Sequence, residues 1–223
     1  MKTFTYALLF FLLLFTACTA PHEKVSVDYT TYVNPFIGTD FTGNTYPGAQ
    51  APFGMVQLSP DNGLPGWDRI SGYFYPDSTI AGFSHTHLSG TGAGDLYDIS
   101  FMPVTLPYKE AEAPLGIHSR FSHDDESATA GYYQVLLKDY NINVELTATE
   151  RCGIQRYTFP EAQAAIFLNL KKAMNWDFTN DSRIEIVDSV TIQGYRFSDG
   201  WARDQHIYFR TRFSKPFTSV QID

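Results

Sequence analysis

Apolar and polar residues alternate with a period of two through most of the second half of the chain. From residue 142 to residue 149, Ile142, Val144, Leu146 and Ala148 share one face, and the polar residues between them share the other. Successive side chains of a strand point to opposite faces, so this pattern predicts a half-buried β-strand. The same alternation predicts strands at residues 131–138, 153–159, 164–170, 189–197 and 206–213.

Several short strands in series predict an all-β fold, an antiparallel β-sandwich or barrel. No segment after the N-terminus has apolar residues at i, i+3, i+4 and i+7 over three turns, so helix should be a minor component. Residues 25–223 contain no internal repeat, charge block or low-complexity tract. The simplest organisation is therefore one domain over residues 25–223.

The first half of the chain has a different pattern, because glycine and proline interrupt nearly every apolar stretch between residues 34 and 94. This predicts long irregular loops on the β scaffold, where binding sites often lie. These loops bring five candidate site residues close together in the sequence: Trp67, Asp68, His85, His87 and Asp95. The alternative is that the loops are inert connections.

The extreme N-terminus has the outline of a bacterial signal peptide. A positive charge at Lys2 precedes an apolar run at residues 7–15 that is too short to cross a bilayer. Thr16 and Ala17 then lead into Cys18, in the manner of a lipobox. We expect residues 1–17 to be removed, Cys18 to carry lipid and anchor the exported protein to a membrane, and residues 18–24 to form a tether. The alternative is an ordinary secretory signal cleaved near Ala17 or Ala20.

Charge and cysteine content limit the expected binding partners and the expected source of stability. The chain has 24 acidic and 16 basic residues, so nucleic acid is not an expected partner. With lipid on Cys18, Cys152 is the only thiol and no intramolecular disulfide can form, so stability must come from burial. Cys152 follows strand residues and nothing nearby in the sequence activates it, which predicts a small buried hydrophobe.

The segment at residues 66–77 has the composition of a sugar-binding site. A sugar ring needs an exposed aromatic platform and polar groups at its edge. Trp67 can supply the platform, with hydrogen bonds from Asp68 and Arg69. Tyr73 and Tyr75 are predicted to be core residues of a following strand.

His85 and His87 lie two residues apart and would point the same way in an extended segment. They can bind metal, hydrogen-bond a ligand or satisfy buried backbone groups. A zinc site would need a third ligand, for which Asp95 is the nearest candidate, but ligand or structural hydrogen bonding is better supported. Asp95 and Asp98 flank one end of this loop, and the acidic run at 124–126 is predicted to be a solvated turn. No carboxylate pair is assigned to catalysis.

At these loops the sequence YVNPFIGTDFTGNTYPGAQAPFGMVQLSPDNGLPGWDRISGYFYPDSTIAGFSHTHLSGTGAGD (residues 32–95) closely resembles the N-terminal domain of glycoside hydrolase family 92. The resemblance extends more loosely through residues 98–104 and the strands beyond. Members of that family are calcium-dependent, inverting exo-α-mannosidases in which an N-terminal β-sandwich packs on an α/α barrel domain. The resemblance therefore implies a β-sandwich and a role in breaking down α-mannoside glycans, of the α-1,2 type.

The family's motifs carry over at residues 67–68, 71–73 and 82–92, which the resemblance places in loops lining the sugar pocket. Ile70 and Ala93 stand where many relatives have cysteine, which implies a different pocket lining or linkage. In the family, the general acid, the general base and most of the calcium environment lie in the barrel domain. Residues 218–223 have a strand-like sequence, and we expect a fragment of a mannosidase that is inactive alone. The alternative is a stand-alone, membrane-tethered mannose-binding module.

Overall fold

The computed structural model describes residues 27–90, 92–112, 115–172 and 177–222. The predicted signal peptide, Cys18 and the tether lie outside these residues. The elements, in order, are η1 (Tyr29–Tyr32), β1 (Ala49–Gln50), β2 (Gln57–Asp61), η2 (Trp67–Arg69), β3 (Thr79–Ile80), β4 (Gly82–Ser84), β5 (Ser100–Thr105), β6 (Ser119–Arg120), η3 (His123–Asp125), β7 (Glu126–Thr129), β8 (Tyr132–Leu137), β9 (Ile142–Ala148), β10 (Gly153–Thr158), β11 (Ala164–Asn169), β12 (Phe178–Asp188), β13 (Thr191–Asp199) and β14 (Gln205–Arg212). Among them, no helix is long and apolar enough to cross a membrane.

The first sheet consists of four consecutive strands joined by hairpins, in the order β10-β9-β8-β7. Val144 on β9 lies opposite Val135 on β8 and Tyr157 on β10. The inward positions of β8 and β9 are buried, except Ala148, which is partly buried, whereas alternate positions face outward. This is the burial pattern that the alternating sequence predicted.

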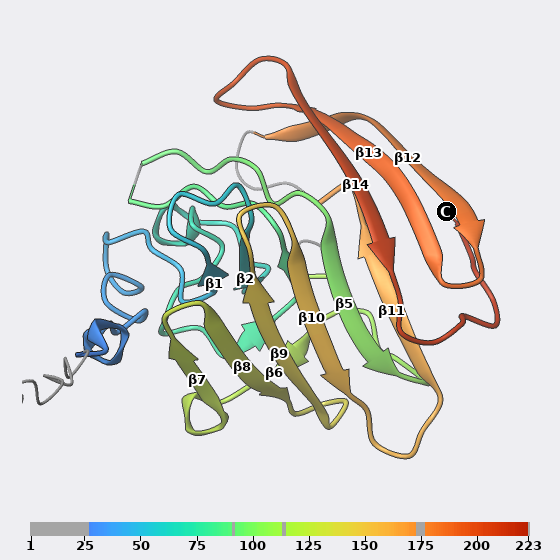
Figure 1. Ribbon diagram of the computed structural model, residues 1–223, viewed down its shortest axis with the longest axis horizontal. Helices are drawn as coiled ribbons and strands as arrows, with labels where there is room; N and C mark the ends of the chain where they lie inside the picture. The colour runs from blue at the N-terminus through green and yellow to red at the C-terminus, as the bar shows by residue number, and fades with distance from the viewer. Residues whose placement is uncertain (1–26, 91, 113–114, 173–176, 223) are drawn as a thin grey trace, which may run out of the picture.

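The second sheet has the order β1-β2-β4-β5-β11 and packs against the first to form the sandwich (Figure 1). On β5, Met102 pairs with Phe167 of β11, and both pack toward the first sheet. The neighbouring pair, Phe101 and Leu168, packs on the opposite face. Since β5 and β11 are covered on both faces, their sequences are nearly continuous apolar runs.

The third sheet, β12-β13-β14, lies beyond β5 and β11 at the upper right of Figure 1. It contributes Ile184, Ile207 and Phe209 to a second apolar cluster with Phe101 and Leu170. The architecture is thus an antiparallel β-sandwich with an additional sheet packed on one side. A two-stranded sheet of β3 and β6 completes the fold.

The predicted all-β class is confirmed, and each predicted strand is present within about two residues of its expected ends. The longest strand, β12, was not predicted. Its sequence is mostly polar and most of its residues are exposed, so alternation is weak. The strand-like sequence at residues 218–222 forms no strand, and that expectation was wrong.

Candidate functional site

Trp67 and Asp68 lie in η2, a single 3-10 turn on the surface. Trp67 is 59% exposed, and one edge of its indole lies against the backbone of Gly92, where a methyl group would sit 3.1 Å from Trp67 Cζ2. Asp68 is partly exposed, and no hydrogen bond joins its carboxylate to any described residue. An exposed indole beside a carboxylate with free acceptor positions is a suitable pair of groups for one sugar ring.

Arg69 was expected to bind a ligand, but its guanidinium forms an ion pair with Asp77 instead. Its Nε and Nη2 donate to the two carboxylate oxygens of Asp77 at 2.6 and 2.5 Å. Tyr73 is buried in the core, as predicted. Tyr75 is 39% exposed and stacks on His123 at 3.9 Å, so its assignment to the core was wrong. Neither tyrosine lies in a strand, because glycine- and proline-rich turns surround them.

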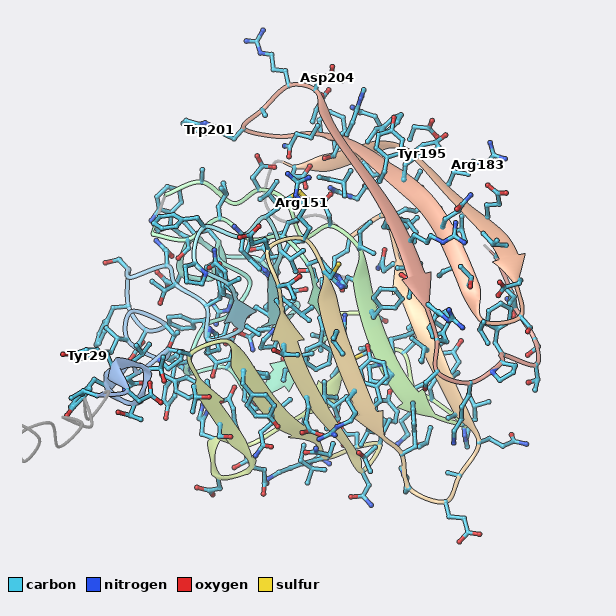
Figure 2. All side chains as sticks on the ribbon, in the orientation of Figure 1. Tyr29, Arg151, Arg183, Tyr195, Trp201 and Asp204 are labelled. Atoms are coloured by element: carbon cyan, nitrogen blue, oxygen red, sulfur yellow. The ribbon has the colours of Figure 1, made fainter. Side chains whose placement is uncertain are left out.

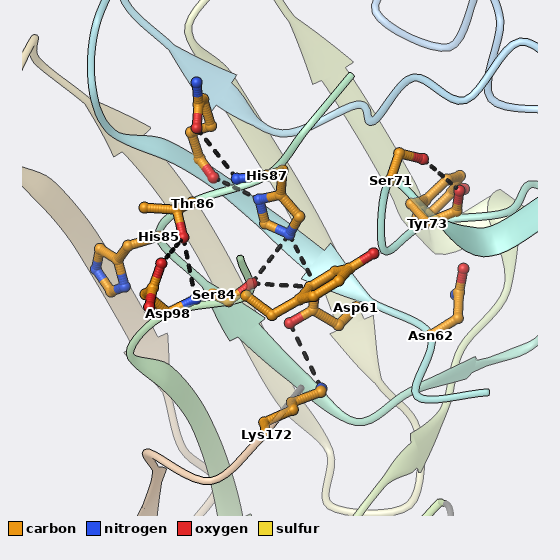
Figure 3. A network of polar contacts seen from close by, with 12 residues as sticks. Asp61, Asn62, Ser71, Tyr73, Ser84, His85, Thr86, His87, Asp98 and Lys172 are labelled. Carbon is orange, nitrogen blue, oxygen red and sulfur yellow. Dashed lines mark hydrogen bonds and ion pairs between the residues drawn. The ribbon is translucent and has the colours of Figure 1, made fainter. Parts of the chain in front are cut away.

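A network of polar side chains around Asp61 and His87 forms a buried centre (Figure 3). Asp61 Oδ1 lies 2.8 Å from His87 Nε2 and accepts a hydrogen bond from Ser84 Oγ at 3.1 Å. His87 Nδ1 donates to the carbonyl oxygen of Gln57 at 2.7 Å, and Lys172 Nζ lies 3.4 Å from Asp61 Oδ2. Burial alone would raise the pKa of Asp61, but Lys172 and the His87 ring hold that pKa below its usual value.

The Asp61, Ser84 and His87 side chains do not form a nucleophilic triad. A triad needs the serine on one imidazole nitrogen and the carboxylate on the other. Here Ser84 Oγ and Asp61 Oδ1 both approach His87 Nε2, at 3.0 and 2.8 Å. His87 is also only 2% exposed. This geometry favours the structural alternative for His87, which joins β2 to β4.

Gly72 shows how tightly the segment that carries Trp67 packs on this centre. Its φ is +89°, and a methyl group at this position would lie 2.6 Å from Asp61 Oδ1 and 3.0 Å from His87 Cδ2. Only glycine combines this backbone conformation with this approach. The segment that carries Trp67 and Asp68 is therefore positioned by the buried residues beneath it.

His85 does not share its partners with His87. Its Nδ1 lies 2.8 Å from the carbonyl oxygen of Ile99, and its Nε2 lies 3.5 Å from the amide nitrogen of Gln155. Burial lowers the pKa of His85 despite the hydrogen bond to Ile99. The two rings are held by separate sets of neighbours (Figure 3).

Asp95 is also buried and fully engaged. Its carboxylate accepts hydrogen bonds from the backbone nitrogens of Leu96 and Trp201, at 2.8 and 2.9 Å, and from Gln205 Nε2 at 2.9 Å. The zinc alternative required Asp95, His85 and His87 to converge. Within the described ranges, no group of three or more His, Cys, Asp or Glu residues could hold a metal ion.

Two other expectations were wrong. Cys152 is exposed, because it lies in the turn between β9 and β10, outside the alternating pattern. The acidic run at 124–126 is only partly a solvated turn, since the side chain of Glu126 is 1% exposed. Glu126 accepts hydrogen bonds from the hydroxyls of Tyr73 and Tyr133 at 2.9 and 2.6 Å.

Sequence patterns gave no sign of two further residues. Arg196 on β13 is fully buried and donates to Asp98 and Asp177, at 2.7 and 2.8 Å. Trp201, in the turn between β13 and β14, is 75% exposed and lies next to Asp95. Both contacts join segments far apart in the chain, and no local pattern encodes them.

The chain is similar to proteins of one glycoside hydrolase family. Residues 32–222 match the model of the glycosyl hydrolase family 92 N-terminal domain. A family GH92 α-mannosidase from Bacteroides thetaiotaomicron, solved alone and with mannoimidazole, is 44% identical with a TM-score of 0.80, over 85% of this chain and 26% of that one. A family GH92 inverting mannosidase from Bacteroides thetaiotaomicron VPI-5482 is 24% identical with a TM-score of 0.63, over 88% of this chain and 31% of that one, and supports the fold alone.

An uncharacterized secreted glycosidase of Arthroderma benhamiae is 28% identical over 144 residues, which are 61% of this chain and 18% of that protein. The chain thus spans about a quarter of the length of the first solved relative and less than a fifth of that of the curated one. The family match covers nearly all of the described residues, from the loops that carry Trp67 to the end of the third sheet. The chain therefore belongs to glycosyl hydrolase family 92, as an N-terminal domain.

Proposed function

We propose that this chain is the pocket-contributing N-terminal domain of a calcium-dependent, inverting exo-α-mannosidase of the α-1,2 type that breaks down glycans. One observation carries the proposal: Trp67 is exposed beside Asp68, whose carboxylate has no hydrogen-bond partner among the described residues. The 44% identity to an α-mannosidase solved with mannoimidazole supports mannoside as the ligand class. Trp67 packs on the apolar face of the sugar, and Asp68 accepts hydrogen bonds from its hydroxyls.

Catalysis requires a second domain. Inversion needs a carboxylic acid and a carboxylate roughly 6.5–9.5 Å apart across the scissile bond. Asp61, Asp95 and Asp98 are each buried and bonded to neighbours within the fold. We infer that an α/α barrel domain supplies both catalytic groups, and that the chain alone hydrolyses no α-mannoside.

Calcium belongs to the same proposal, with its ligands mainly on the barrel domain. Ca²⁺ takes six to eight oxygen ligands. The described residues offer no cluster of three or more acidic or histidine side chains for it. No calcium ligand set is therefore assigned to the described residues, and no step of catalysis is assigned to calcium.

Export and membrane attachment are also proposed. The similarity to a secreted glycosidase supports export, and the lipobox at Cys18 supports lipid anchoring on the periplasmic or outer face. Cell fractionation tests this: wild type should partition with membranes, and Cys18→Ser should not. Equal solubility of the two proteins, with no lipid on either, would reject the anchor.

Fusion to a barrel domain tests the main proposal. This chain would replace the N-terminal domain of the 44% identical Bacteroides thetaiotaomicron α-mannosidase. The fusion should hydrolyse α-1,2-mannobiose in a calcium-dependent manner, and Trp67→Ala and Asp68→Asn should lower kcat/KM by about tenfold or more. Asp124→Asn, at an exposed residue of η3, is the control. A folded fusion that is active but insensitive to both site changes would refute the pocket assignment.

A stand-alone mannose-binding module is the second candidate. The Trp67–Asp68 pair can bind a sugar, whereas the carboxylates of Asp61 and Asp95 are buried and hydrogen-bonded within the fold. Calorimetry of the isolated chain with α-mannobiose distinguishes the two. Binding at Trp67 without the barrel domain favours the module, whereas binding only in the fusion favours a shared pocket.

A further inference from the structure

The turn between β13 and β14 presents Trp201 to solvent. Figure 2 shows Trp201 at the tip of this hairpin, pointing away from the sheet. Trp201 is 75% exposed, yet two hydrogen bonds hold the backbone of its turn. The Trp201 nitrogen donates to Asp95 Oδ2 at 2.9 Å, and the Gly200 nitrogen donates to the carbonyl oxygen of Ala202 at 3.0 Å.

The anchor for this turn is a buried charge. Asp95 is 2% exposed, and Gln205 Nε2 lies within 3.0 Å of both of its carboxylate oxygens. A methyl group at Gly200 would lie 2.2 Å from Asp95 Oδ1, so the turn can approach this closely only with glycine. Burying a carboxylate is costly unless hydrogen bonds compensate it. The hydrogen bonds of Asp95 therefore define where Trp201 stands.

The same loop also supports Trp67. Gly92 lies against the Trp67 indole, and Asp95 is three residues further along. One short segment thus contacts Trp67 on one side and the turn of Trp201 on the other. Residues 92–95 therefore connect the surroundings of two exposed indoles that are far apart in the sequence.

We propose that Trp201 is a second sugar-contacting residue, which stacks on the ring that follows the terminal mannose on the leaving-group side. This rests on the proposed function. An exo-acting pocket encloses only the terminal sugar, so the next ring lies outside the pocket, where an exposed indole can stack on it. Arg203, in the same turn, is exposed and has no ion-pair partner among the described residues, so it can donate to sugar hydroxyls.

Two substrates that differ only beyond the terminal mannose test this. In the fusion enzyme, Trp201→Ala should lower kcat/KM for α-1,2-mannobiose by about tenfold, and should leave kcat/KM for α-mannosyl fluoride unchanged. The variant keeps the bond to Asp95, because that bond comes from the backbone. Trp201→Phe should restore most of the activity on the disaccharide. Tyr208→Ala, at an exposed aromatic on the outer face of the same sheet, is the matched control.

The proposal would be overturned if Trp201→Ala lowered kcat/KM equally for both substrates. It would also be overturned if the ratio of the two kcat/KM values stayed the same while the melting temperature fell. Either result would assign Trp201 to contact with the rest of the enzyme. No change on either substrate would also overturn it. If the wild-type fusion hydrolyses neither substrate, the proposed function fails separately. The indole N–H resonance of Trp201 in the full chain then decides: a shift on adding α-mannobiose supports the contact, and no shift at saturating sugar refutes it.

Discussion

The guanidinium of Arg196 donates to Asp98 Oδ1 at 2.7 Å, although both side chains are fully buried and 98 residues separate them. A second hydrogen bond reaches Asp177 at 2.8 Å, and Arg196 Nε lies 3.2 Å from the carbonyl oxygen of Leu170. These bonds connect the third sheet to the segments that flank β5 and β11. Buried charges are tolerated because each has partners.

Replacing Arg196 by methionine should strongly lower the free energy of unfolding. The change leaves two buried carboxylates without their cation, which costs about 3–5 kcal/mol out of a typical total of roughly 5–15 kcal/mol. Urea unfolding followed by tryptophan fluorescence measures the loss. Arg183→Met, on the exposed strand β12, should change the free energy of unfolding by less than about 0.5 kcal/mol. Similar stabilities for the two variants would contradict a stabilising role for the buried network.

Trp67 and His87 were both predicted to contact ligand, but the structure gives them different surroundings. Trp67→Ala removes a mostly exposed ring, so the melting temperature should hardly change while mannoside turnover by the fusion falls. His87→Ala removes one partner of Asp61 and the donor to the carbonyl oxygen of Gln57, which should cost about 1–3 kcal/mol. Thermal unfolding and kinetics of the folded fraction separate these effects. A stable His87→Ala protein with reduced sugar affinity would show that His87 contacts the ligand.

Glu126 should be more important for stability than its acidic neighbours. A glutamine has one acceptor oxygen, so Glu126→Gln cannot accept from both Tyr73 and Tyr133 and also pair with His123 Nδ1, which lies at 2.7 Å. We expect a loss of about 1–3 kcal/mol in the free energy of unfolding. Asp124→Asn, two residues earlier, should have little effect. If both substitutions are neutral by chemical denaturation, the carboxylate is not a structural acceptor.

The contribution of His85 to stability should fall as the pH drops below about 6.5, the pKa of histidine in the unfolded chain. Burial holds the pKa of His85 below that value in the folded protein. In this range the unfolded chain therefore binds a proton that the folded chain does not, and the His85 contribution to the free energy of unfolding decreases with decreasing pH. Asp177 contributes in the opposite direction, because burial raises its pKa to about 6 in the folded protein. Urea titrations at several pH values between 7.5 and 5.5 measure the slope.

His85→Gln should reduce that slope, because the amide of glutamine can still donate to Ile99 but does not titrate. His206→Gln changes a half-exposed ring on the outer face of the third sheet and serves as the control. An unchanged slope in His85→Gln would show that other groups cause the pH dependence.

The sequence predicted the strands that have one buried face. It also singled out Trp67 and Asp68, which are neighbours in the chain and lie together on the surface. β9 was found because Ile142 to Leu146 alternate between core and solvent, and Trp67 and Asp68 are adjacent residues in one turn. β12 was not predicted, because most of its residues are exposed and its sequence alternates only weakly. The sequence predicts Asp95 to be a ligand-binding residue, but in the structure its carboxylate accepts from the backbone of Trp201, 106 residues away. Nothing in local spacing reveals such a contact.

The long sequence separation of these contacts has a consequence for how the chain folds. The hairpins β7–β8, β8–β9, β9–β10, β12–β13 and β13–β14 each join neighbouring strands and need only short loops to close. The bonds of Arg196 to Asp98 and of Trp201 to Asp95 close loops of 98 and 106 residues. Non-local pairing is slow because chain entropy is lost before contacts form. The third sheet should therefore dock after the sandwich has begun to assemble, and weakening its polar anchors should speed unfolding more than it slows folding.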